Sequence, residues 1–334
     1  MRRWIYWLLI IGFFAVVIIH FNEFTDFSRI LARGQFQWMF AAIALQLLHY
    51  LVSSASYRVA FNTVGVHTRL RDLVPLLFGA LFVNVVAPTG GASGAALFVD
   101  HAARNGESPV RTAAGILLQL IISMLAVVVI LAAGLSYMGT QHRLLSYHII
   151  ASVILVVGFG LITGLLLLAV RRPAFLTLLF TWLQRIVNKL SKRIKRIKAI
   201  SDEWVEEHVI ELMEAGAAVA KNPRKLAFTL AILLLAHVIN LAVLYTLFLS
   251  FSLSIPIGSL VAGYAIGLLF LIVSITPQGV GVVEGIMPLV FHSFGIPTGI
   301  ATLTVLAFRG LTFWLPLLVG FLLLRRMDLF RKMR

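Results

Sequence analysis

Long apolar stretches dominate the chain, and six of them resemble segments that cross the ~30 Å hydrocarbon core of a bilayer. They are residues Trp4–Ile19, Trp38–Ser56, Ala113–Tyr137, Ile149–Val170, Leu226–Phe251 and Gly299–Leu324. The first is the shortest and follows two arginines, as a signal peptide would, but no small-residue cleavage site comes after it. The pattern therefore predicts an all-α polytopic membrane protein, with residues 1–334 as a single integral membrane domain and an uncleaved first span.

Two further apolar segments, Leu73–Val99 and Pro256–Phe294, are interrupted near their centres by proline and glycine. The first bend, as we call residues 87–94, reads Ala-Pro-Thr-Gly-Gly-Ala-Ser-Gly, and the second bend, residues 276–281, reads Thr-Pro-Gln-Gly-Val-Gly. Proline removes a helical hydrogen-bond donor and glycine weakens a helix. Each segment is therefore predicted to form two half-helices joined by a bend.

The distribution of lysine and arginine predicts the orientation of the chain. Lysine and arginine are enriched in the cytoplasmic loops of membrane proteins. Of the two orientations that the chain could take, the one with both termini in the cytoplasm places 24 of the 28 lysine and arginine residues on that side. The two interrupted segments then enter the membrane from opposite faces as re-entrant hairpins, in the manner of inverted transporter repeats. An internal pseudo-repeat is an open alternative. It is suggested by two similar runs, Gly-Ala-Leu-Phe-Val at 79–83 and Gly-Leu-Leu-Phe-Leu at 267–271.

The composition supports a membrane protein and excludes several kinds of chemistry. Apolar residues make up 60 % of the chain, charged residues 12 %, and the mean hydropathy is +0.98. The absence of cysteine excludes disulfides, thiolate nucleophiles and cysteine-ligated metals. The net charge of +15 follows from the cytoplasmic loops, so nucleic acid is not expected as a partner, and we expect a cell inner membrane location.

The one sizeable polar region, Arg171–Lys225, is predicted to be a cytoplasmic amphipathic helical segment. Apolar residues recur there at helical spacing, with basic residues between them, and an acidic stretch follows. The apolar set is Trp182, Ile186, Leu190, Ile194 and Ile197, and the acidic set is Asp202, Glu203, Glu206, Glu207, Glu211 and Glu214. A helix of this kind binds in the headgroup layer of anionic lipids, although a solvated hairpin with paired charges remains the alternative.

Only two formal charges occur between Leu226 and Leu324, namely Glu284 and Arg309. A charge near the bilayer centre costs about 2.5–3.5 kcal/mol even on lenient scales, so it persists mainly where it is paired or functional. Arg309 lies near the middle of the last span, and Glu284 follows Pro277 by about two helical turns. A Glu284–Arg309 pair is predicted, either as a structural ion pair or as a contact for a lipid headgroup.

The bends supply the other candidate residues of a substrate path. A bend frees backbone groups, and the half-helix after it presents its positive dipole end to an anion such as phosphate. The candidates are Pro88, Gly90, Gly91 and Gly94 at the first bend, and Pro277, Gly279, Gly281 and Gly285 at the second. Asn84 precedes the first bend and could either cap freed backbone groups or contact a headgroup. The alternative is a purely structural role, in which the glycines let helices pack closely.

Other polar residues do not form a catalytic or metal site in the sequence. The order Asp-x-x-Ala-Arg at 100–104 is used by enzymes that transfer phospho-alcohols, but the two further aspartates that hold their metals are missing. His49, His237 and His292 are isolated on apolar segments, and none has a metal-ligand partner three or four residues further along the chain, so they are interpreted as satisfied packing residues. No catalytic residue, metal or cofactor is expected.

The C-terminal motifs resemble those of a known family. They read Thr-Pro-Gln-Gly-Val-Gly-Val-Val-Glu-Gly at 276–285, Phe-Gly-Ile at 294–296, Arg309, and Trp-Leu-Pro-Leu-Leu-Val-Gly at 314–320. This pattern closely resembles the lysylphosphatidylglycerol synthase transmembrane, or flippase-like, family, and the first bend is similar to its first signature. Many members carry an acid and an arginine soon after those glycines, whereas here the nearest charges are Asp100 and Arg104.

The resemblance implies a helix bundle with two re-entrant hairpins that moves phospholipids or lipid-linked groups between leaflets. Bifunctional members add a soluble aminoacyl-transferase domain, and because this sequence ends at Arg334 we expect only the membrane half and no lysyl transfer. Anionic phospholipids are the expected partners. Two alternatives stay open: an intramembrane lipid-modifying enzyme, and a scaffold or subunit for a separately encoded transferase that docks on residues 171–225.

Overall fold

Every regular element in the described part of the chain is a helix. The computed structural model describes residues 34–171, 173–193, 201–274 and 276–326. The predicted all-α class is therefore confirmed for these residues. The predicted span Trp4–Ile19 and both termini lie outside them.

Five helical runs are long and apolar enough to cross a membrane. They are α3 (Phe36–Thr63), α6 (Pro109–Thr140), α7 (Ser146–Arg171), α10 (Pro223–Ser250), and the run that joins α13 (Thr298–Arg309) to α14 (Leu315–Arg326). Each coincides with a predicted span, and the ends differ by a few residues. The most extensive packing is between α3 and α10, and α6 packs next most extensively against α11 (Ile257–Val273).

Both interrupted segments break where proline and glycine predicted a break. The first forms α4 (Leu70–Val86) and α5 (Ala92–Arg104), and the second forms α11, a short 3₁₀ helix η1 (Pro277–Gly279) and α12 (Val282–Ser293). The two helices of each segment pack against each other. The connecting backbone takes φ values of +64° at Gly90, +95° at Gly91 and +81° at Gly281, which glycine adopts without a steric penalty.

The last predicted span is not a regular α-helix throughout. Directly after Arg309 the chain forms one turn of π-helix, η2 (Gly310–Trp314), before α14 continues. The wider turn changes the intrahelical hydrogen bonds. One carbonyl of this turn, that of Leu311, accepts a hydrogen bond from the hydroxyl of Tyr50 on α3 at 2.9 Å. π-Helical turns occur often at functional sites, and this one adjoins the charged residue of the span.

The end of α4 packs against the second bend, and α14 crosses α4. A side chain at Gly320 would collide with the backbone of Phe78, so glycine permits this close crossing. The end of α4 that leads into the first bend then joins a buried cluster with the second bend and the π-helical turn. Its buried members are Phe82, Val83, Val85, Val280, Phe313, Trp314 and Leu317.

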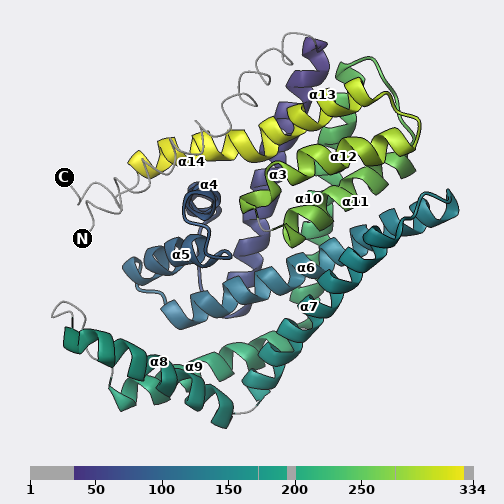
Figure 1. The fold of residues 1–334 in the computed structure, drawn as a ribbon. Helices are drawn as coiled ribbons and strands as arrows, with labels where there is room; N and C mark the ends of the chain where they lie inside the picture. The colour runs from purple at the N-terminus through teal and green to yellow at the C-terminus, as the bar shows by residue number, and fades with distance from the viewer. Residues whose placement is uncertain (1–33, 172, 194–200, 275, 327–334) are drawn as a thin grey trace.

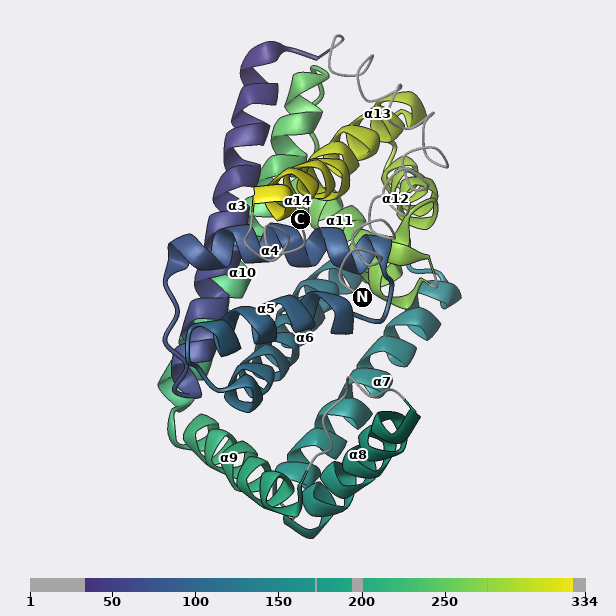
Figure 2. The ribbon, with the colours of Figure 1, turned by 90° about the vertical axis from the view of Figure 1, so that its left-hand side faces the viewer.

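A helical hairpin of α8 (Pro173–Arg193) and α9 (Asp202–Lys221) lies at one end of the molecule (Figures 1 and 2). Its own small core joins Leu176 of α8 to Val205 and Val209 of α9. The helix predicted to continue through Ile197 ends at Arg193 in the described residues, and residues 194–200 lie outside them. The hairpin thus has a small core of its own, and α9 also packs into the bundle through the buried Ala215.

Candidate functional site

Arg309 and Glu284 form the ion pair predicted from the sequence. The Nε group of Arg309 donates to Oε1 of Glu284, and its Nη2 group donates to the backbone carbonyl of Gln278 at 2.9 Å. The guanidinium carbon lies 5.1 Å from the centre of the Phe313 ring. Side-chain exposure is 5 % for Arg309 and 10 % for Glu284. The pair is therefore a nearly buried clamp that ties the last span to the second bend.

Glu284 lies closer to the second bend than its spacing from Pro277 predicts. It is in the first turn of α12, because the non-helical backbone extends through Gly281 and α12 begins only at Val282. The N-cap residue of α12 is Gly281, which provides no side-chain hydrogen bond, so the carboxylate of Glu284 is the negative group at this positive helix end. Its Oε2 atom is buried and has no hydrogen-bond partner among the described residues.

At the first bend, Asn84 caps freed backbone groups. Its Oδ1 atom accepts from the Gly94 amide at 2.8 Å and from the Ser93 hydroxyl at 3.0 Å. The Thr89 hydroxyl accepts from the Ser93 amide at 2.8 Å. Of the two roles that the sequence left open for Asn84, the structure shows capping. The start of α5 is thus satisfied by neutral side chains of the bend itself.

The candidate glycines fall into three groups with different physical reasons. A Cβ at Gly94 would meet the Asn84 side chain, and one at Gly279 would lie 2.9 Å from the Leu271 backbone, so both positions require close packing. Gly90, Gly91 and Gly281 have positive φ and face open space. Gly285 is helical, exposed and also faces open space. Neither packing nor backbone conformation explains the glycine at position 285. Of the two prolines, Pro88 is exposed and Pro277 begins η1.

Polar contacts between α3, α10 and α11 satisfy His49 and His237, as the sequence analysis expected, but the sequence did not identify their partners. His49 Nδ1 donates to the Ala236 carbonyl at 3.0 Å, and the next residue, His237, has its Nδ1 atom 2.8 Å from the Tyr264 hydroxyl. Asn240 Nδ2 donates to the same hydroxyl at 3.4 Å. Because α3 and α10 are far apart in the sequence, no local spacing could have revealed these contacts.

The other polar residues considered in the sequence analysis, Asp100, Arg104 and His292, lie at the surface. Asp100 and Arg104 form a half-exposed ion pair one helical turn apart on α5, with 2.8 Å between the nearest atoms. His292 is exposed and contacts the Thr298 hydroxyl. Among the described residues, no group of three or more histidine, aspartate or glutamate side chains could hold a metal ion. The Glu284–Arg309 pair is therefore the main concentration of charge within the apolar helices that the structure describes.

Comparison with known proteins relates nearly the whole chain to one group of membrane proteins. Residues 4–320 match the family model described as the lysylphosphatidylglycerol synthase TM region. A UPF0104 membrane protein of Methanocaldococcus jannaschii is 25 % identical over 325 residues, which cover 94 % of this chain and 92 % of that protein. A UPF0104 membrane protein of Pyrococcus horikoshii is 22 % identical over 324 residues, covering 94 % and 95 % of the two chains.

Proposed function

Because this chain belongs to the lysylphosphatidylglycerol synthase transmembrane-region family, we propose that it moves a phospholipid or lipid-linked headgroup between the leaflets of the cytoplasmic membrane. The observation that carries the proposal is the Glu284–Arg309 pair, nearly buried at a bend between two apolar helices. In this proposal the basic loops, including residues 171–225, lie in the cytoplasm.

A packing role alone does not explain why this pair is ionic. Buried ion pairs lose hydration that their attraction only partly restores, and well-packed apolar residues often serve stability as well or better. A guanidinium, by contrast, is suited to binding phosphate through two parallel hydrogen bonds. In the proposed cycle Glu284 neutralises Arg309 at rest, and the phosphate of a headgroup replaces that carboxylate during passage. The arginine then always has an anionic partner.

The open side of the bends provides the proposed route for the headgroup. Gly281 and Gly285 leave space beside Glu284, and Gly90 and Gly91 leave space at the first bend. We place the two broken segments in the membrane as oppositely inserted re-entrant hairpins, related as a possible inverted repeat. The headgroup passes between them while its acyl chains stay in the bilayer. Because the pair is nearly buried here, passage requires α12 and the α13–α14 run to separate locally.

Reconstitution into vesicles that contain a fluorescent phospholipid tests the proposal. Lipid in the outer leaflet is bleached by an impermeant reductant, so further loss of fluorescence reports movement between leaflets. We expect the wild-type protein to accelerate movement, and Glu284→Gln and Arg309→Ala to abolish the acceleration. The matched control replaces the surface pair on α5, Asp100→Asn with Arg104→Gln, and should behave as wild type. Wild-type vesicles that bleach no faster than protein-free vesicles, across several lipid classes, would refute the proposal.

A further inference from the structure

The outward face of α8 carries an exposed apolar stripe. Leu178, Trp182 and Ile186 are spaced four residues apart and are 71 %, 56 % and 38 % exposed. Residues at this spacing share one side of a helix. Unlike the exposed side chains of the long spans, this stripe lies on a helix that is too polar to count among the five candidate spans.

This stripe is not the surface that α8 uses to pack on α9. Leu176 and Phe180 face α9, where they contact Val205 and Val209, and Gln184 on the same side donates to Asp202 at 2.8 Å. At 100° per residue, Leu178 lies roughly 200° around the helix from Leu176. The helix is therefore apolar on two opposite sides, and α9 covers one of them.

Basic residues share the outward face with the stripe. Arg185 and Lys189 are exposed, and the helical periodicity places them on the same side as the stripe. The exposed charges in the first two turns of α9 have the opposite sign, with Glu203, Glu206 and Glu207 all exposed. The hairpin therefore separates its charge, with a basic and apolar outer face on α8 and an acidic face on α9.

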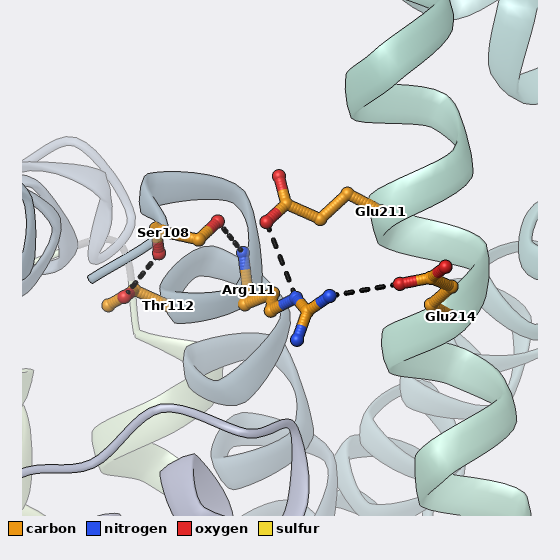
Figure 3. Close-up of polar contacts among 5 residues, drawn as sticks. All are labelled: Ser108, Arg111, Thr112, Glu211 and Glu214. Carbon is orange, nitrogen blue, oxygen red and sulfur yellow. Dashed lines mark hydrogen bonds and ion pairs between the residues drawn. The ribbon is translucent and has the colours of Figure 1, made fainter. Parts of the chain in front are cut away.

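Two connections hold the α8–α9 hairpin at the ends of candidate spanning helices. The helix α7, one of the five candidate spans, ends at Arg171 and α8 begins at Pro173, so α8 starts directly after the end of a candidate span. Figure 3 shows the second connection: Arg111, at the start of α6, reaches Glu211 at 3.3 Å and Glu214 at 2.9 Å on α9. Both ends of the hairpin are thus tied to the ends of spanning helices.

We propose that α8 lies in the headgroup layer of an anionic bilayer, with Leu178, Trp182 and Ile186 in the acyl boundary and with Arg185 and Lys189 on lipid phosphates. Tryptophan and basic residues that flank an apolar face are typical of interfacial helices. Each basic residue near an anionic surface strengthens binding roughly fivefold. This lipid surface is independent of the Glu284–Arg309 site and of lipid movement.

The absence of cysteine from the sequence makes a site-specific test simple. Full-length Trp182→Cys protein is labelled with an environment-sensitive fluorophore and reconstituted into vesicles of phosphatidylcholine alone or of an equimolar mixture with phosphatidylglycerol. Iodide then quenches labels that face water. The matched control is Glu207→Cys on the exposed acidic side of α9. We expect the label at position 182 to be blue-shifted and quenched several-fold less than the label at 207 in the mixed vesicles.

The charge contribution is tested by adding Arg185→Gln and Lys189→Gln to the Trp182→Cys chain. Removing two basic residues should weaken the surface contact roughly 25-fold, so much of the shielding in mixed vesicles should disappear. Equal quenching at positions 182 and 207 in mixed vesicles overturns the proposal. Shielding that is the same in detergent, in neutral vesicles and in mixed vesicles also overturns it, because protein would then cover the stripe.

Discussion

The two bends have similar sequences but satisfy their freed backbone groups in different ways. At the first bend the neutral side chains of Asn84 and Thr89 accept the amide hydrogens at the start of α5. At the second bend α12 has no side-chain cap, and the Gln278 carbonyl is instead bound by the charged Arg309. A bend whose backbone amides are hydrogen-bonded by its own neutral side chains is expected to keep one conformation. In the proposed cycle, the second bend exchanges the Glu284 carboxylate on Arg309 for the phosphate of a headgroup.

The largest expected effect comes from removing one charge at the second bend. Arg309→Met leaves the Glu284 carboxylate buried without a cation, and such a loss costs about 3–5 kcal/mol. Replacing both residues, as Arg309→Met with Glu284→Gln, removes both charges and should recover most of that stability. Denaturant unfolding in detergent measures both variants. A single variant as stable as wild type would show that the pair does not hold the second bend.

The first bend should lose less stability and keep its function. Asn84→Ala removes an acceptor of two hydrogen bonds, and leaving a buried donor unpaired costs about 1–3 kcal/mol. Because no charge is exposed or removed, lipid movement in vesicles should continue. Thr140→Ala is the control, since the Thr140 hydroxyl bonds only to its own helix. If Asn84→Ala abolished movement while the protein stayed folded, the distinction between a fixed and an exchanging bend would be wrong.

The π-helical turn beside Arg309 is tested by Tyr50→Phe. The substitution removes the hydroxyl that donates to the Leu311 carbonyl and keeps the ring, so a loss of about 1 kcal/mol is expected. Tyr147→Phe, at an exposed tyrosine, provides the matched control. An unchanged unfolding midpoint for Tyr50→Phe would indicate that the turn needs no support from α3.

The smallest effect on stability is expected at Gly285, where the effect on function should be large. Alanine in a helix is more stable than glycine by about 0.5–1 kcal/mol, and a Cβ at position 285 meets no atom. Gly285→Ala should therefore stabilise the protein slightly and slow lipid movement by narrowing the space beside Glu284. Normal movement in this variant would place the headgroup elsewhere.

The sequence predicted the parts of this protein that depend on local composition. Apolar runs located the five described spans, because a bilayer requires about 20 consecutive apolar residues whatever lies around them. Proline and glycine located both breaks, and the isolation of Glu284 and Arg309 in apolar sequence predicted their pairing. The position of Glu284 relative to the bend was wrong by about one helical turn, since the backbone of Gln278 and Gly281 has positive φ and delays the start of α12.

Contacts between distant helices were decided by the tertiary structure. The crossing of α14 over α4 depends on Gly320 passing the backbone of Phe78. The hydrogen bond of His49 to Ala236 joins two spans across 187 positions. The hydrogen bond from Arg309 to the Gln278 carbonyl also depends on the tertiary structure, because a backbone acceptor cannot be predicted from the pattern of side chains. A sequence specifies which segments leave water, because that choice depends on each segment alone. Which polar groups meet inside depends on how the segments pack, and packing is a property of the whole chain.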